Sequence, residues 1–255
     1  MNNFEKFRDL HYGDSPLLIG NCWDLTSARI FAALGFKAIA TSSRALALNL
    51  GYEDGQNLPF EMLLDVVKKI KSEVDVPFSV DLERGYADSS KGIADNLQKL
   101  FDQGVAGVNI EDSSPGDSRI LRSVSDFQNL LSGIKEELFK RKIEIFINAR
   151  TDGFLRKMPD AFSQTLERVV AYEKAGADGI FVPLAINLSQ IKQISSSVQI
   201  PLNVLRTAGL PPFSQLYHAG VRRISMGSSA FEVAKKSLTN ILESVLKAGS
   251  FEAFG

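Results

Sequence analysis

The stretch Ala175-Gly176-Ala177-Asp178-Gly179-Ile180 carries the pattern that decides the fold. An amphipathic segment ends at its first glycine, and a short apolar run begins three residues later. Because glycine can adopt the left-handed conformation that closes a helix, this junction predicts a helix, a glycine cap and then a strand. The same pattern recurs at residues 34–39, 103–108 and 219–224. The four copies indicate a chain built from repeated helix–strand units.

Eight apolar runs of strand length alternate with segments of helical periodicity. The runs cover residues 17–20, 38–41, 78–81, 108–111, 143–149, 179–183, 202–205 and 223–226. Near-continuous apolar strands between amphipathic helices predict a parallel sheet covered by helices, and eight such units suit an α/β fold of the TIM (β/α)8 barrel type. A doubly wound open sheet is the alternative, although no Gly-x-Gly-x-x-Gly follows the first strand.

The end of the sequence predicts one further amphipathic helix. Its apolar stripe consists of Phe231, Ala234, Leu238, Ile241, Leu242 and Val245. The stripe can cover its own barrel or be exchanged onto a neighbouring copy, and periodicity does not distinguish the two. No linker, low-complexity tract or shift in composition divides the chain, so we expect a single domain over residues 1–255.

Composition limits the chemistry that is available. The 29 basic and 30 acidic residues leave a net charge of −1, without the basic excess of a nucleic-acid-binding protein. No apolar stretch suggests a membrane span, and the first ten residues lack a signal-peptide core, so we expect a cytoplasmic protein. The only cysteine, Cys22, excludes an intrachain disulfide and a cysteine-based zinc or iron–sulfur site. With only two histidines, a site must be built mainly from carboxylates, hydroxyls, arginines and backbone.

Acidic side chains gather where the predicted strands end. Asp81 and Glu83 follow the third strand, and Glu111 ends the fourth. In a barrel these strand ends share one mouth, where carboxylates repel one another unless a cation neutralises them. Oxygen ligands alone favour Mg²⁺ or Mn²⁺ over zinc. The simpler interpretation is that such acids are solvated or cap helices, and we assign that role to Asp88 and Asp112.

Arg150 and residues 42–44 are candidates for binding an anion. Arg150 follows the fifth strand, and Asn148 stands two positions before it, so we expect both side chains to point to the same side. Its guanidinium can clamp a carboxylate or phosphonate, or pair with the acids. Ser42, Ser43 and the amide of Arg44 can bind an anion at the start of the next helix, although a serine there is also an ordinary N-cap.

Glycines after the last two strands offer a different site. Gly209 follows the seventh strand, and Gly227-Ser228-Ser229 follows the eighth. Their amides can cradle a phosphate, as in many barrels of this type, whereas the simpler interpretation of Gly227 is a tight turn. A phosphate-ligand barrel enzyme is therefore an alternative function.

At these residues the sequence resembles the isocitrate lyase and phosphoenolpyruvate mutase superfamily, over nearly its whole length. The resemblance rests on ordered motifs at residues 21–29, 40–43, 51–55, 81–86, 109–112, 148–152 and 220–227. It implies a TIM-like barrel, a Mg²⁺-dependent site and a small 2-oxo or 2-hydroxy carboxylate substrate. Members typically form tetramers in which the last helix packs on a neighbouring barrel, so the resemblance also implies a homotetramer.

The resemblance implies roles for individual residues. Asp81 would be the closest metal ligand, with Glu83 and Glu111 acting mainly through water. Asp54 would stand beside the metal, and Arg150 would grip the substrate. The full expectation is catalytic Asp54, Tyr86 and Arg150; substrate-binding Trp23, Asp24, Ser42, Ser43, Arg44, Asn148, Arg150 and Asn203; and metal-binding Asp81, Glu83 and Glu111.

The segment after the fourth strand departs from the superfamily. The lyases carry Lys-Lys/Arg-Cys-Gly-His there, whereas residues 113–120 contain neither Cys nor His. The Lys and Asn of the mutase gate are also missing between Asp112 and Phe127. The usual Asp-x-Asp has become Asp81-x-Glu83, a mild change for a carboxylate that acts through water. Water, Tyr86, Ser113 and Arg119 remain the candidate proton donors.

We therefore expect a Mg²⁺-dependent lyase or phosphonomutase, with Mn²⁺ as a substitute ion. It would act on a C–C or C–P bond of a small carboxylate through an enolate or pyruvate-like intermediate. A hydrolase of oxaloacetate- or phosphonopyruvate-like substrates is an alternative, and a non-catalytic binding protein that lost its gate is another.

Overall fold

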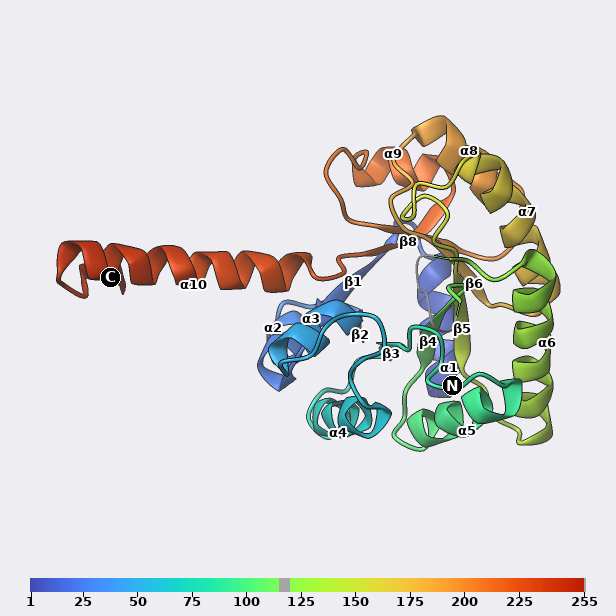
Figure 1. Cartoon of the computed structure of the whole chain (residues 1–255), viewed down its shortest axis with the longest axis horizontal. Coiled ribbons are helices and arrows are strands. Elements are labelled where there is room, and N and C mark those ends of the chain that lie inside the picture. Colours follow the sequence, from blue (N-terminus) through green and yellow to red (C-terminus); the bar gives the residue numbers. More distant parts are fainter. Residues whose placement is uncertain (115–119, 255) are drawn as a thin grey trace.

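Eight parallel strands form a closed barrel in the computed structural model, which describes residues 1–114 and 120–254 (Figure 1). The strands are β1 (Leu17–Cys22), β2 (Ala38–Thr41), β3 (Phe78–Asp81), β4 (Gly107–Glu111), β5 (Phe146–Arg150), β6 (Gly179–Val182), β7 (Leu202–Leu205) and β8 (Val221–Ser225). They pair in sequence order, and β8 closes the ring against β1, with Leu17 opposite Arg223. The predicted TIM-type barrel is confirmed, and the open-sheet alternative is wrong.

The predicted strands agree with the observed ones best at their centres. The second, third and seventh have the predicted bounds. The fifth begins at Phe146 rather than at residue 143, and the eighth begins at Val221 and ends at Ser225. Ile143 and Ile145 are buried although they precede the strand, so their apolar character marks burial rather than strand pairing.

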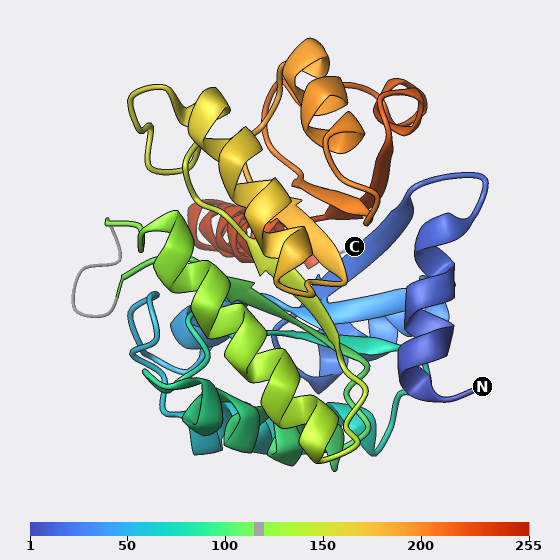
Figure 2. The same ribbon diagram turned by 90° about the vertical axis from the view of Figure 1, so that its right-hand side faces the viewer.

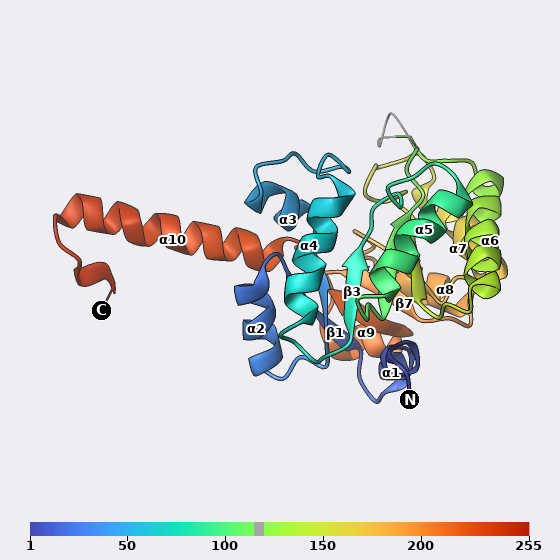
Figure 3. The same ribbon diagram turned by 90° about the horizontal axis from the view of Figure 1, so that it is seen from below.

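Helices surround the barrel, as the views from the side and from below show (Figures 2 and 3). The helices around it are α1 (Asn3–Asp9), α2 (Leu25–Ala33), α3 (Ser43–Asn49), α4 (Phe60–Lys71), α5 (Ser90–Phe101), α6 (Val124–Lys140), α7 (Ala161–Lys174), α8 (Leu188–Ser196) and α9 (Phe213–His218). A further helix, α10 (Ser229–Ala248), follows β8, and short 3-10 turns lie at Leu10–Tyr12 and Glu252–Phe254. The inner face of α4, for example, buries Leu63, Val67 and Ile70, whereas Lys68 and Lys69 are exposed.

Helix α1 lies at the end of the barrel where the strands begin. Its Phe7 is fully buried, with its ring centroid 5.4 Å from that of Phe146 at the start of β5. Gly107 at the start of β4 leaves room for this ring, because a Cβ atom there would come within 2.7 Å of Phe7. The other end of the barrel, where the strands finish, stays open.

Helix α10 leaves the barrel instead of packing on it (Figure 1). It follows β8 directly, yet none of its residues is buried. Its apolar side chains Val233, Leu238 and Leu246 are 63%, 56% and 84% exposed. Of the two predicted positions for this helix, the structure therefore does not have the one on its own barrel. Among the helices that the structure describes, none is long and apolar enough to span a membrane.

Candidate active site

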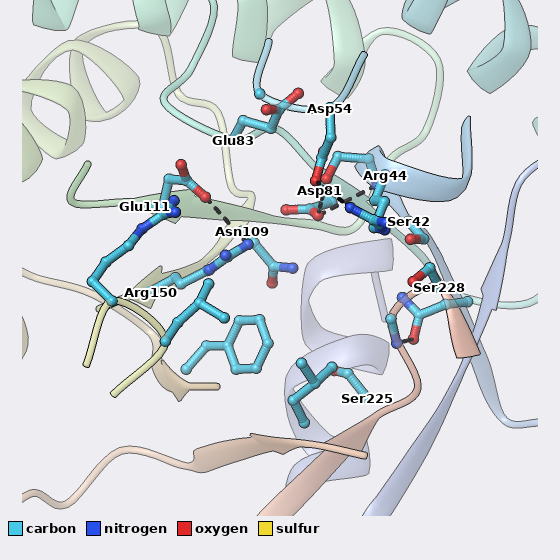
Figure 4. A pocket seen from close by; sticks show the side chains of 18 residues that line it. Ser42, Arg44, Asp54, Asp81, Glu83, Asn109, Glu111, Arg150, Ser225 and Ser228 are labelled. Carbon is cyan, nitrogen blue, oxygen red and sulfur yellow. Dashed lines mark hydrogen bonds and ion pairs between the residues drawn. The ribbon is translucent and has the colours of Figure 1, made fainter. Parts of the chain in front are cut away.

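A pocket of about 460 Å³ lies at the open end of the barrel (Figure 4). Eight of the predicted site residues line it: Ser42, Ser43, Arg44, Asp54, Asp81, Glu83, Glu111 and Arg150. They come from the ends of β2 to β5 and the segments that follow, because parallel strands bring their carboxyl ends to one edge. The predicted convergence of acids and arginines on one mouth is thus present.

Asp81 lies at the centre of the pocket's acidic side. Its backbone N–H donates to Thr41 Oγ1 at 2.8 Å, and its Oδ2 accepts from Ser43 Oγ at 2.8 Å. Its Oδ1 is buried and has no hydrogen-bond partner. A buried carboxylate oxygen without a partner is costly, so a cation is the natural complement of this atom.

Glu83 is held in an unusual backbone conformation. Its φ is 50° and that of Tyr86 is 56°, in the left-handed region that non-glycine residues rarely adopt. Gln56 Oε1 stabilises this turn, because it accepts from the backbone N–H of Arg84 and Tyr86 at 3.1 and 3.3 Å. Burial, followed by repulsion from Asp81 and Glu111, raises the pKa of Glu83 to about 8. The neighbouring acids thus disfavour the ionised form of Glu83, and a cation bound beside them would favour it.

Glu111 and Arg150 form an ion pair across neighbouring strands. Arg150 Nη1 lies 3.2 Å from Glu111 Oε2. Arg150 also donates to both carboxylate oxygens of Asp152, from Nε at 2.6 Å and from Nη2 at 2.9 Å. This bidentate contact fixes the plane of the guanidinium. Burial raises the pKa of Glu111, whereas Arg150 opposes that shift, and Ser113 Oγ donates to Glu111 Oε1.

The second strand supplies the opposite wall. Ser42 Oγ caps α3 by accepting from Ala45 N at 3.3 Å, so the N-cap interpretation holds for this serine. Arg44 Nη1 lies 3.8 Å from Asp54 Oδ2, at the solvent-facing rim. Burial and the nearby Asp81 raise the pKa of Asp54, and Arg44 lowers it.

The family model of phosphoenolpyruvate phosphomutase matches residues 7–246. The chain belongs to this family. The family lies within the phosphoenolpyruvate mutase and isocitrate lyase superfamily, so the predicted resemblance is confirmed.

Relatives within the superfamily carry several activities. An uncharacterized protein of Mycobacterium tuberculosis is 34% identical over 88% of this chain and 82% of its own. The oxaloacetate decarboxylase of Pseudomonas fluorescens is 28% identical over 91% and 80%. A crystal structure from Burkholderia cenocepacia, provisionally named a phosphonomutase, is 34% identical, with a TM-score of 0.88 over 94% of this chain and 99% of its own.

A more distant structure shows the fold with ligands. Phosphonopyruvate hydrolase in complex with oxalate and Mg²⁺ matches with a TM-score of 0.85 over 99% of this chain and 89% of its own. The two sequences are only 19% identical, so this likeness concerns the fold.

Five predicted residues of the family's site lie outside the pocket lining. Trp23 packs edge-on against Phe231 at the start of α10, with ring centroids 5.3 Å apart. Asp24 caps α2 by accepting from Ser27 N at 2.7 Å. Tyr86 lies behind Glu83 and donates to its Oε1 at 3.3 Å. The other two are Asn148 and Asn203.

These two asparagines point into the barrel but lie below its mouth. Asn148 donates to Asn109 Oδ1 at 2.9 Å, and Asn203 exchanges hydrogen bonds with Ser225. Each is only 1% exposed. Inward direction follows from strand alternation, whereas depth follows from the stagger of the strands, which sequence does not display.

The expected surface role of Asp112 is wrong. Its side chain is fully buried and accepts from Arg168 Nη1 at 3.1 Å and from Tyr172 Oη at 2.7 Å. Arg168 Nη1 also donates to the carbonyl of Arg122 at 3.0 Å, so it joins the two ends of the segment that follows β4. Asp88 is exposed, as expected. The candidate proton donor Arg119 lies outside the described residues.

Several pocket residues carried no predicted role. They are Asn21, Gly55, Asn109, Leu155, Arg156, Phe181, Leu205 and Ser225, whereas Gly227 and Ser228, which also line it, belong to the alternative phosphate site. Asn21 and Asn109 belong to motifs quoted above, and each stands at an inward-facing strand position, which was an available signal. Phe181 and Leu205 look like ordinary core residues in the sequence, and only the closed barrel brings them to the mouth.

The residues present fit a divalent cation held by few protein ligands. Within the part of the chain that the structure describes, no three His, Cys, Asp or Glu side chains lie close enough to enclose a metal ion. The unpartnered Asp81 Oδ1 and the cluster of carboxyl groups around it instead suit Mg²⁺, which typically binds one or two carboxylates and keeps several waters.

Proposed function

We propose that the protein is a Mg²⁺-dependent enzyme that acts on a small 2-oxo or 2-hydroxy carboxylate. It would cleave or rearrange the adjacent C–C or C–P bond through an enolate or pyruvate-like intermediate. The observation that carries the proposal is the buried, unpartnered Asp81 Oδ1 in an acidic pocket that also contains Arg150. Membership of the phosphoenolpyruvate phosphomutase family supports it.

The pocket residues divide into two groups in this proposal. Asp81 would hold Mg²⁺ directly, with Glu83 and Glu111 acting through water and Asp54 beside them. Mg²⁺, or Mn²⁺ in its place, supplies a Lewis acid that stabilises negative charge on a substrate oxygen. Arg150, whose plane Asp152 fixes, would bind the substrate carboxylate together with Ser42, Ser43 and the amide of Arg44.

Carbon–carbon bond cleavage and phosphonomutase activity are equally supported as the reaction, and hydrolysis of the same substrates is the alternative. The phosphate-ligand alternative has less support. The backbone N–H groups of Met226 and Gly227 both donate to Asn21 Oδ1, at 2.7 and 3.1 Å. These amides are therefore engaged in joining β8 to β1 rather than free to cradle a phosphate, and Gly227 adopts a turn with φ 55°.

Replacement of Asp81 by Ala tests the proposal. Wild-type protein with Mg²⁺ should turn over at least one of oxaloacetate, phosphonopyruvate, phosphoenolpyruvate and substituted malates. Loss of the ion's ligand should lower kcat/KM by at least about 100-fold, because charge on the substrate oxygen loses its stabilisation. Asp88→Ala removes an exposed acid nearby and should leave kcat/KM unchanged.

Product identification assigns the reaction. Pyruvate with a second carbonyl compound or acid indicates a lyase, an isomer indicates a mutase, and released acetate or phosphate indicates a hydrolase. If no substrate of the panel turns over, or if Asp81→Ala retains wild-type activity, the proposal is wrong. Binding of Mg²⁺ without turnover would favour a non-catalytic binding protein.

We also propose that the chain forms a homo-oligomer through exchange of α10, and that this oligomer is a tetramer. A hollow of about 500 Å³ lies between the end of α2 and the start of α9, beside Leu18, Leu34, Phe36 and Phe213. Leu34 and Phe213 are 73% and 51% exposed. Apolar surface is therefore open at the place where the helix that follows β8 would pack if it covered its own barrel. The exposed stripe of α10 from a second copy is complementary to this surface. A single domain and a cytoplasmic location remain predictions from sequence.

A further inference from the structure

Asn109 is a pocket residue whose amide has a fixed orientation. Strand register places it opposite Asp81 on one side and Asn148 on the other. Its Oδ1 accepts from Asn148 Nδ2 at 2.9 Å and from Arg223 Nη2 at 3.4 Å. Because two donors occupy the carbonyl end, the NH₂ end is the part that remains for the pocket (Figure 4).

Arg223 gives this orientation an electrostatic basis. It is 1% exposed and lies inside the barrel, with its guanidinium 5.5 Å from the centre of the Phe7 ring. Its Nε and Nη1 have no hydrogen-bond partner. No carboxylate of the described residues lies within ion-pair distance of it. The positive charge therefore attracts the carbonyl end of the Asn109 amide and leaves the positive end of the amide dipole facing the pocket.

The neighbouring groups make a neutral donor valuable at this position. The acids beside it cannot donate when they are ionised, and Ser43 Oγ already donates to Asp81. Glu111 and Asp152 occupy part of the Arg150 guanidinium, so only its remaining N–H groups are left for the substrate carboxylate. A substrate oxygen that gains negative charge between Asp81 and Arg150 would meet the N–H groups of Asn109.

We propose that Asn109 is a substrate-binding residue that donates to the charged oxygen of the substrate, and that Arg223 is the positioning residue that aims it. The proposal rests on the function proposed above, since it concerns the same pocket. It adds a neutral donor, a buried arginine and a direction of hydrogen bonding to that site.

Titration calorimetry with oxalate in the presence of Mg²⁺ tests the role of Asn109. Oxalate is a planar dianion that resembles the enolate of pyruvate, because one of its carboxylates matches the carboxylate of the enolate and an oxygen of the other matches the enolate oxygen. Asn109→Ala should weaken its binding by at least about tenfold, the effect of removing one hydrogen bond to a charged group. Ser79→Ala removes an unpartnered buried hydroxyl from the neighbouring β3 and should leave the affinity within twofold.

A second variant separates binding from folding. Asn109→Ala leaves two buried donors without an acceptor, whereas Asn109→Asp retains the acceptor and can pair with Arg223. Asn109→Asp should therefore keep a Tm at least equal to that of Asn109→Ala, yet bind oxalate more weakly than the wild type by at least about tenfold. Wild-type affinity in either variant would overturn the proposal while leaving the Mg²⁺ site intact.

A double-mutant cycle tests the role of Arg223. Arg223→Met should weaken oxalate binding at least about threefold in the wild type but less than twofold in Asn109→Ala, because its effect passes through the amide. An equal loss in both backgrounds would overturn the positioning role. If the wild type fails to bind oxalate with Mg²⁺, the proposed function fails as well, and this outcome is distinct from a loss confined to the variants.

Discussion

Individual residues at the closed end of the barrel couple stability to pH. His11 is 1% exposed, with its ring stacked on Phe146 at a centroid distance of 4.7 Å. Burial, with a smaller effect of Arg223, lowers the pKa of His11 to about 3. An unfolded chain would bind a proton at this histidine near pH 6.5, whereas the folded chain would not. Stability should therefore fall as the pH drops from about 6.5 toward 3.

Replacement of His11 by Gln should remove this contribution. The difference in unfolding free energy between pH 6.5 and 4.5 should shrink by about 2–3 kcal/mol, close to the value for one proton over two pH units. Urea unfolding at both pH values measures it. His218→Gln, at the exposed histidine, is the matched control and should leave the difference unchanged. An unaltered pH dependence in His11→Gln would show that other groups dominate.

Some residues of the candidate site could be predicted from the sequence, and others could not. Asp81, Glu111 and Arg150 were predictable because a polar side chain directly at the end of an apolar strand has few alternatives to the barrel mouth. Asn148 appeared equivalent, but it is buried outside the pocket lining and donates a hydrogen bond to the pocket residue Asn109. Asp112 was misjudged because its partner Arg168 is 56 positions away, a separation that no local pattern reveals.

At the scale of single elements, the proposed exchange of α10 can be tested by substitutions in its apolar stripe. Substitution of Leu238 or Leu242 by Glu should shift the protein to smaller species in sedimentation velocity, because a charge would be buried in the exchanged interface. Lys236→Glu changes the charge on the opposite side of the same helix and should leave the assembly intact. Wild-type protein that sediments as a monomer, or a Leu238→Glu variant with unchanged assembly, would refute the exchange.

Element type was easier to predict than element placement. The glycines at the helix–strand junctions predicted the repeated units. These glycines, Gly35, Gly104, Gly176 and Gly220, all have positive φ. The apolar stripe of α10 would be identical whether it covered its own barrel or another. The sequence pattern therefore could not predict that α10 leaves the barrel. The strained turn at Glu83 likewise depends on the distant Gln56 side chain.

The whole barrel depends on how its closed end is filled. Phe7 is fully buried and contacts β4, β5 and the Arg223 guanidinium of β8. Phe7→Ala should lower the free energy of unfolding by about 3–5 kcal/mol, as for other buried phenylalanines, with a lower midpoint in urea. Tyr12→Ala, at a side chain that is 59% exposed, should cost less than about 1 kcal/mol. Equal losses in the two variants would argue that α1 is not part of the folded unit.

Helix α10 has a thermodynamic consequence for the molecule that carries it. A helix of 20 residues with no buried side chain obtains little stability from its own chain, and isolated helices are marginal in water. If its packing comes from a second copy, part of the folding free energy depends on how many copies are present. The Tm should then rise with protein concentration, and dilution alone would loosen both α10 and the barrel surface left open beside it.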